Sequence, residues 1–94
     1  MKKEARSDLW QKLKKNRKEL DFLDQTLLTL LNRRLRITRK IGKIKKGIRK
    51  KIYDAQREKE ILDRLKRKNK GPLREGDLEK LFTTIMKVCR QSQI

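Results

Sequence analysis

The stretch LWQKLKKNRKELDFLDQTLLTLLNRRLRITRKIGKIKKGI, residues Leu9–Ile48, repeats an apolar side chain at steps that alternate between four and three residues. The series is unbroken once two polar residues, Asn16 and Arg34, are counted as its members. Such spacing is typical of a helix whose apolar stripe faces another helix. No proline interrupts the stretch, so it predicts one helix from about Ser7 to about Lys46. The apolar members of the stripe are Leu9, Leu13, Leu20, Leu23, Leu27, Leu30, Ile37, Ile41, Ile44 and Ile48.

This helix is too long for its own chain to cover. At about 1.5 Å per residue it would extend on the order of 60 Å. A compact chain of 94 residues has a radius of gyration of about 12 Å. We therefore expect a helical partner for the stripe, most simply a second copy of the chain, and a single domain over residues 1–94.

The remainder of the chain predicts two shorter helices. The second should begin near Asp54, a residue type favoured at helix N-caps, and continue through Leu65. The segment KNKGPLREGD, Lys68–Asp77, then interrupts it with two glycines and a proline. A third helix should follow Asp77, and its stripe reaches Gln93 at its last turn. No strand-length window alternates β-branched and polar residues, so the predicted fold class is all-α. The stripe of the third helix comprises Leu78, Leu81, Phe82, Ile85 and Cys89.

The composition favours an anionic partner and excludes several kinds of site. Lys and Arg number 30 against 12 Asp and Glu, and the formal net charge of +18 attracts polyanions, anionic membranes or small anions. One Cys and no His form neither an internal disulfide nor a Cys/His zinc site, so no metal is expected. The first ten residues lack the apolar region of a signal peptide, and no apolar run approaches the roughly 20 residues that span a bilayer. We therefore expect a cytoplasmic protein that does not enter the membrane.

Two cationic residues lie on the face that the long stripe predicts to be buried. Arg34 occupies a stripe position between Leu30 and Ile37, where a polar group costs free energy unless it finds a partner. Lys45 follows 11 residues later, on nearly the same face and about 16 Å along the axis. Two such long side chains could lean together onto one small dianion. Alternatively, Arg34 tilts to the rim of the stripe or pairs with an acidic neighbour.

Asp54 and Glu58 stand one helical turn apart at the start of the second predicted helix, with Arg57 beside them. They could serve the helix itself, Asp54 as its N-cap and Glu58 through the helix dipole. Neighbouring positive charge would keep both carboxylates ionised, which argues against acid and base catalysis of the glycosidase kind. The functional interpretation that suits them better is hydrogen bonding to a ligand.

Cys89 and Gln93 are likewise one turn apart, on the third predicted helix. A Cys on an apolar stripe is more commonly a small core residue than a nucleophile, and the sequence holds no His to activate it. On pattern alone, Gln93 would be a solvated side chain.

Four segments of the chain, in their order and spacing, resemble the all-helical class of chorismate mutases. They are RKELDFLDQTLLTLLNRR (residues 17–34), IGKIKK (41–46), IYDAQREKEIL (52–62) and LFTTIMKVCRQSQ (81–93). Each is degenerate alone, but together they cover nearly the whole chain after the first dozen residues. The resemblance implies an intertwined homodimer with two equivalent sites, in which the long first helices pack against each other. It also implies conversion of chorismate to prephenate, a pericyclic rearrangement that needs no cofactor, metal or nucleophile.

The resemblance assigns roles to four cationic or amide residues. Arg17 would reach from one protomer into the partner's site, where it and Arg34 clamp the two carboxylates of chorismate. Helix geometry agrees, because Arg17 and Arg34 lie about 25 Å apart along one helix and could hardly meet the same small ligand from one chain. Lys45 would contact a carboxylate and the ether oxygen whose bond breaks, and Gln93 would donate to the same oxygen. Lys45, Gln93 and Arg34 would thus be the catalytic residues.

The other matched positions would bind the ring of chorismate. Asp54, Arg57 and Glu58 would close over the ring, and Glu58 would accept a hydrogen bond from the ring hydroxyl. Cys89 would lie near the ring carboxylate, where a serine is common in the family.

Three other functions stay open from the sequence. A basic helical nucleic-acid-binding protein would explain the charge, although the basic residues are spread over all three predicted helices and few aromatics are available for stacking. Isochorismate-pyruvate lyases share the architecture, but Asp54 with Arg57 and Glu58 resembles the mutases more closely. A non-catalytic, regulatory member of the family is the third.

Overall fold

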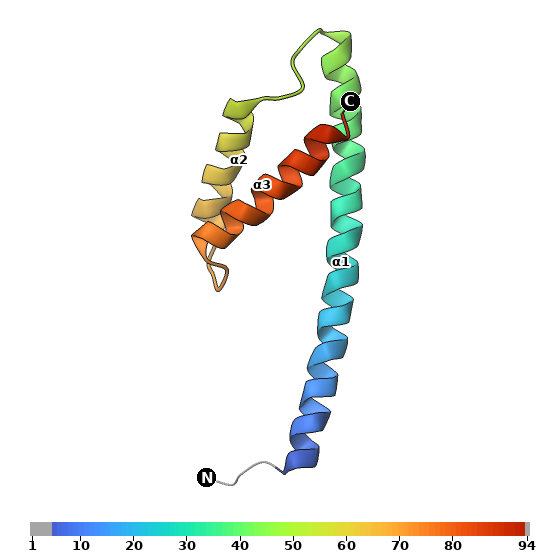
Figure 1. Ribbon diagram of the computed structural model, residues 1–94, viewed down its shortest axis with the longest axis vertical. Helices are drawn as coiled ribbons and strands as arrows, with labels where there is room; N and C mark the ends of the chain where they lie inside the picture. Colours follow the sequence, from blue (N-terminus) through green and yellow to red (C-terminus); the bar gives the residue numbers. More distant parts are fainter. Residues whose placement is uncertain (1–4, 94) are drawn as a thin grey trace. The chain divides into compact units, whose positions relative to one another are not determined.

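The computed structural model describes residues 5–93, and every regular element within that range is a helix (Figure 1). α1 comprises Arg6–Gly47, α2 comprises Ala55–Lys68 and α3 comprises Glu75–Gln91. The all-α class and the three predicted helices are therefore confirmed. α1, with 42 residues, agrees with the bounds predicted from its apolar stripe to within one residue at each end. Among the described residues, no helix is both long and apolar enough to cross a membrane.

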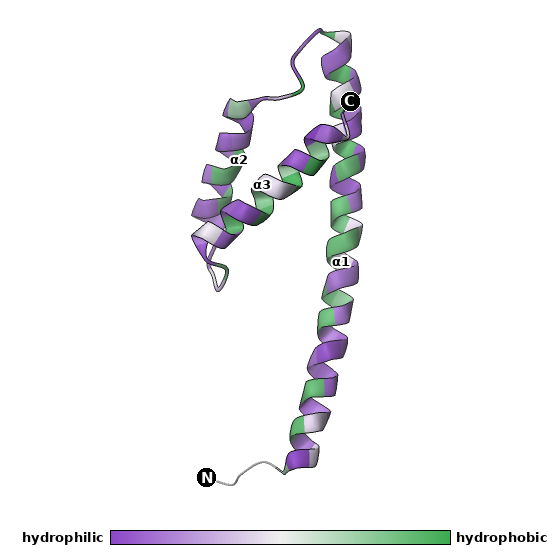
Figure 2. Cartoon of the chain, in the orientation of Figure 1, coloured by the Kyte–Doolittle hydropathy of each residue, from purple (hydrophilic) through white to green (hydrophobic). Residues whose placement is uncertain are grey.

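The contacts within the chain divide it into two compact units, one up to Arg33 and the other from Arg34 onward. The first unit contains the amino-terminal part of α1, along which apolar and polar residues are interleaved (Figure 2). Six leucines at stripe positions of this unit are between 38% and 58% exposed. An apolar helix face of this length is normally covered by another helix, and the second copy of the chain that would cover it stays a prediction. The six are Leu9, Leu13, Leu20, Leu23, Leu27 and Leu30.

The second unit contains the carboxyl-terminal part of α1 together with α2 and α3 (Figure 1). α2 and α3 pack against each other. The core of the unit lies on α3, where Leu78, Met86 and Cys89 are each 4% exposed. α1 contributes a buried glycine, Gly42. The predicted core position of Cys89 is therefore confirmed.

α1 ends in a Schellman motif. The N–H of Lys50 donates to the carbonyl of Lys45 at 2.7 Å, and the N–H of Arg49 donates to the carbonyl of Lys46 at 3.3 Å. Arg49 has a φ of 56°, in the left-handed region where a side chain is unfavourable and glycine is preferred. Because the cap closes on the carbonyl of Lys45, it fixes how the segment 50–54 leaves the helix next to that residue.

Replacing Arg49 by glycine should stabilise the protein. Arg49→Gly relieves the left-handed strain, and we expect a gain of about 0.5–1 kcal/mol in the free energy of unfolding after the added flexibility of the unfolded chain is counted. Lys51→Gly is a matched control, because it removes the same charge from the same segment at a residue with negative φ. Urea denaturation measures both. A urea midpoint for Arg49→Gly below that of the parent protein would contradict the claim that the backbone of Arg49 is strained.

The turn between α2 and α3 is organised by the side chain of Asn69. Its Oδ1 accepts from the N–H of Gly71 at 2.9 Å, and its Nδ2 donates to the carbonyl of Leu73 at 2.7 Å. Gly71 has a φ of 75°, which glycine adopts without steric cost. The predicted break between the second and third helices therefore has a local cause.

The predicted start of the third helix, after Asp77, is wrong by three residues. α3 begins at Glu75, so Gly76 lies inside its first turn. The N–H groups of a first turn have no partner within the helix, so a residue that disfavours the helix interior is tolerated there. Asp77 accepts from Arg74 Nε at 3.0 Å, and the carboxylates of Glu75 and Asp77 favour the positive end of the helix.

Candidate active site

A cavity of about 440 Å³ lies in the second unit, and seven of the eight predicted site residues line it. They come from the carboxyl-terminal part of α1, the N-cap and first turn of α2, the end of α3 and the residues that follow it. This volume falls within the range of roughly 300–1,000 Å³ that is common for small-ligand pockets. The seven are Arg34, Lys45, Asp54, Arg57, Glu58, Cys89 and Gln93.

Arg17, the eighth predicted site residue, lies in the first unit. It is exposed there and lines a surface hollow on α1 beside Trp10 and Lys14. Its expected contribution to the site of a partner chain stays a prediction.

The cavity combines positive charge with an apolar wall. Within the part of the chain that the structure describes, five cationic side chains and two carboxylates line it. Electrostatic interactions are stronger beside apolar groups than in open water, because water screens them less. The lining therefore suits a small anionic ligand with an apolar body. Its large apolar residues are Ile37, Ile41, Ile52, Ile61 and Met86.

Arg34 and Gln93 each present a buried polar atom without a protein partner. Among residues 5–93, Arg34 Nη1 and Gln93 Oε1 are the buried side-chain atoms that make no hydrogen bond. An unpaired buried polar atom costs about 1–3 kcal/mol. The sequence left open that Arg34 pairs with an acidic neighbour, and within residues 5–93 its Nη1 makes no such pair. Both residues line the cavity, so a ligand that brings a hydrogen-bond partner to these atoms would be favoured there.

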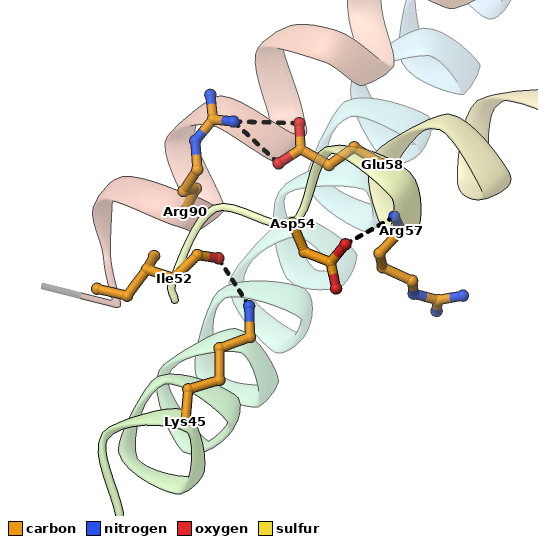
Figure 3. Close-up of polar contacts among 6 residues, drawn as sticks. All are labelled: Lys45, Ile52, Asp54, Arg57, Glu58 and Arg90. Carbon is orange, nitrogen blue, oxygen red and sulfur yellow. Dashed lines mark hydrogen bonds and ion pairs between the residues drawn. The ribbon is translucent and has the colours of Figure 1, made fainter. Parts of the chain in front are cut away.

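Lys45 connects the end of α1 to the segment that precedes α2. Its Nζ donates to the carbonyl of Ile52 at 2.7 Å (Figure 3). An ammonium has three donors, so two remain for a ligand in the cavity. Lys45 therefore holds the segment 50–54 in place and adds positive charge to the lining.

Asp54 is the N-cap of α2, as the first of its two interpretations predicts. Its Oδ1 accepts from the N–H of Arg57 at 3.0 Å (Figure 3). Its Oδ2 lies 3.8 Å from Lys50 Nζ. The Arg57 side chain is exposed and extends away from Glu58 (Figure 3). Capping leaves Asp54 with acceptor capacity, since a carboxylate offers about four acceptor sites. A ligand contact by Asp54 or Arg57 stays a prediction.

Glu58 is paired with Arg90, a residue that sequence reasoning missed. Arg90 Nη1 donates to Glu58 Oε2 at 2.9 Å and lies 3.2 Å from Oε1 (Figure 3). The Arg90 guanidinium also lies 4.4 Å from the centroid of the Tyr53 ring. Arg90 is one turn beyond buried Met86 on α3, which is the signal that could have placed it near the cavity. The pair joins α2 to α3 at the cavity wall.

Removing Arg90 should destabilise the protein. Arg90→Ala leaves the half-buried Glu58 carboxylate unpaired and removes the cation from Tyr53, so we expect a loss of about 1–2 kcal/mol. Arg64→Ala, at an exposed position on α2, removes the same charge and should change stability by less than about 0.5 kcal/mol. Urea denaturation compares the two variants. Equal urea midpoints for the two variants would show that the ion pair between Arg90 and Glu58 contributes nothing to stability.

Residues 16–94 of the chain match the family described as chorismate mutase type II. The chain belongs to this family. A similar protein is the bifunctional chorismate mutase/prephenate dehydratase of Aquifex aeolicus, which is 34% identical over 83 residues. The match covers 84% of this chain and 23% of that protein, so the chain spans about a quarter of the length of the curated relative.

Two solved structures resemble this type II chorismate mutase chain in fold. The chorismate mutase of Helicobacter pylori, determined in complex with prephenate, has a TM-score of 0.80 and 38% identity over 86% of this chain and 88% of that one. A conserved hypothetical protein of Pyrococcus furiosus has a TM-score of 0.73 and 36% identity over 88% of this chain and 96% of that one. Both alignments extend over most of each chain, so the likeness is that of a whole fold.

Cys89 is a further feature of this member of the chorismate mutase type II family. It is a free cysteine, and it both belongs to the core and lines the cavity. A thiol is a weak hydrogen-bond donor, so Cys89 supplies mainly shape at this point of the wall. The expected closeness of Cys89 to a ring carboxylate stays a prediction.

Proposed function

We propose that this chain catalyses the rearrangement of chorismate to prephenate in the cavity of its second unit. The observation that carries the proposal is the buried, unpaired donor Arg34 Nη1, on a residue that lines one cavity together with Lys45 and Gln93. Membership of the chorismate mutase type II family supports it. Chorismate carries two carboxylates on an apolar frame, which matches a cationic cavity with an apolar wall.

The reaction breaks the ether C–O bond and forms a C–C bond in one pericyclic step. No proton or group passes to the protein, so the task of the site is to hold the substrate in its reactive chair and to stabilise developing charge. Negative charge grows on the ether oxygen as its bond to carbon lengthens. Lys45, with two donors left after its bond to Ile52, and Gln93 are the residues that we assign to that oxygen.

Arg34 is assigned to a carboxylate of the substrate. Its guanidinium presents several donors in a plane, a geometry that fits a carboxylate, and Nη1 is buried and unpaired before a ligand arrives. Glu58 already accepts from Arg90, and its remaining acceptor sites suit the ring hydroxyl. Asp54 and Arg57 line the same cavity at the start of α2, and we assign them to closing over the ring.

The site also requires a second copy of the chain. The uncovered leucine stripe of α1 favours an intertwined homodimer, in which the partner's Arg17 would clamp the other carboxylate. Light scattering should then give a mass about twice the 11.4 kDa of one chain. A well-folded monomer would contradict the contribution of the partner's Arg17. The cytoplasmic location expected from the sequence stays a prediction.

Turnover of chorismate by the purified protein tests the proposal. The protein is produced in a host without a chorismate mutase of its own, and loss of the diene absorbance of chorismate is followed against the uncatalysed rate. The expected result is rapid loss of absorbance with prephenate as product. A rate no higher than the uncatalysed one would refute the activity and favour a non-catalytic, regulatory role.

Two further measurements test for lyase activity and for nucleic-acid binding. Incubation with isochorismate would release pyruvate if the chain were a lyase, whereas we expect none. Gel shifts with mixed DNA are followed at increasing salt, since binding of merely electrostatic origin weakens steeply as salt rises. A shift that persists at physiological salt would favour a nucleic-acid-binding protein.

A further inference from the structure

Gly42 lies on α1 where the residues that follow α3 come into contact with it. A Cβ added to Gly42 would lie 2.8 Å from Gln93 Cβ and 3.0 Å from both Gln93 Cα and Cγ. Real Cβ atoms essentially never lie closer than 3.0 Å to such a neighbour. Any residue larger than glycine at position 42 therefore requires Gln93 to move.

Gln93 has few other restraints among the described residues. It lies two residues beyond the end of α3, and its backbone N–H donates to the carbonyl of Arg90 at 3.1 Å. Its Oε1 is buried without a hydrogen-bond partner within residues 5–93. The close contact with Gly42 therefore fixes the base of the Gln93 side chain, from which its amide extends.

Gln93 and Gly42 also stand beside a second cavity, of about 420 Å³. Gln93 lines both this cavity and the one assigned to chorismate, whereas Gly42 lines the second. A side chain displaced by a residue at position 42 thus has space to move away from the first cavity. Because a hydrogen bond is lost over a few tenths of an ångström beyond about 3.5 Å, a small displacement removes the donor from the reaction.

The geometry points to Gly42 as a positioning residue for the reaction. Because Gly42 has no side chain, Gln93 can lie directly against α1, and its amide then lies at the reacting ether oxygen. This inference rests on the proposed function for the role of Gln93. It also explains why a glycine occurs at this position of α1. Glycine is unfavourable in the middle of a helix compared with alanine, so its presence in α1 needs a packing or functional reason.

Steady-state kinetics with four variants test the inference. Gly42→Ala should lower kcat for chorismate by about 10–100-fold, with KM changed by less than about threefold, because the misplaced amide acts mainly in the transition state. Gly47→Ala is the matched control on the same helix, since a Cβ there meets nothing within 4 Å, and it should keep the parental kcat. Gln93→Ala should also lower kcat. The double variant Gly42→Ala/Gln93→Ala should be no slower than Gln93→Ala, because both changes remove the same amide.

Two kinetic results would overturn the inference. One is a parental kcat in Gly42→Ala. The other is a double variant whose loss equals the product of the two single losses, since Gly42 would then act independently of Gln93. If Gly42→Ala fails to fold, Gly42→Ala/Gln93→Gly is compared with Gln93→Gly by circular dichroism. Rescue of folding by the smaller residue 93 supports the inference. Failure to fold there too overturns it, because the crowding would then come from the backbone and not from the side chain that carries the amide.

A readout that does not depend on turnover separates this inference from the proposed function. In ¹⁵N-labelled protein, the side-chain amide signals of Gln93 are assigned by their loss in Gln93→Ala. They should move in Gly42→Ala and stay in place in Gly47→Ala. If the parent protein does not convert chorismate but the signals move as expected, the proposed function fails and the positioning by Gly42 stands. Unmoved signals in Gly42→Ala overturn the positioning whatever the activity.

Discussion

Lys45→Ala is expected to lower kcat/KM for chorismate by about a hundredfold to a thousandfold. The ammonium is the cation of the cavity that we assign to the ether oxygen, and it is fixed in advance by its 2.7 Å bond to the carbonyl of Ile52. A group that is already oriented stabilises developing charge without reorganising during the reaction. Rates are measured by chorismate absorbance, with helical circular dichroism to confirm folding.

Two variants make this experiment specific. Lys43→Ala removes the same charge from an exposed position of α1 and should keep near-parental activity. Lys45→Gln retains a hydrogen-bond donor for the segment 50–54 but carries no charge, and it should be nearly as impaired as Lys45→Ala. Near-normal activity of Lys45→Ala would refute its role. Recovery of activity in Lys45→Gln would show that anchoring of the segment, and not charge, is what the residue supplies.

Replacement of Arg34 should lower activity and raise stability together. Arg34→Met keeps much of the side-chain volume and removes a guanidinium whose Nη1 is buried and unpaired. Relief of that desolvation should increase the free energy of unfolding by about 1 kcal/mol. Loss of a carboxylate clamp should lower kcat/KM by at least about a hundredfold, because charged hydrogen bonds are worth roughly 1.5–3 kcal/mol and also fix the substrate.

Lower activity together with higher stability distinguishes a substrate-binding role of Arg34 from a structural one. If Arg34 served only the fold, its replacement would lower the free energy of unfolding. Activity would then fall only as far as the fraction of folded protein falls. Arg36→Met is the control, since it removes the same group from an exposed position two residues away. Urea midpoints and chorismate turnover are measured on the same preparations. Parental activity in Arg34→Met would contradict the assignment.

The helices were predictable because their signals are local and repeated. Twelve stripe positions from Leu9 to Ile48 set the bounds of α1, and a single cap residue, Asp54, set the start of α2. The start of α3 was missed because Gly76 looks like a helix breaker, whereas a first turn tolerates it. Periodicity reports which face is apolar, and it does so more reliably than it reports the first residue of a helix.

The candidate site was predictable only in part, because contacts between helices leave no periodic trace. The stripe pattern singled out Arg34 and Lys45, and resemblance to a family added Gln93; the structure places all three around one cavity. Arg90 was missed since it is one of 30 basic residues and its partner, Glu58, lies 32 positions away. The approach of Gln93 to Gly42 joins the end of the described chain to α1, and neither residue alone indicates it.

A chorismate site completed by the arginine of a second copy is tested most directly by mixed dimers. Arg17→Ala and Arg34→Ala are unfolded together and refolded at equal amounts, and turnover of chorismate is measured against each variant alone. Half of the dimers should be mixed, and each should hold one site with both arginines intact, so about a quarter of the parental activity should return from two inactive parents. A mixture no more active than its parents, with exchange of chains confirmed, would contradict a site shared between two chains.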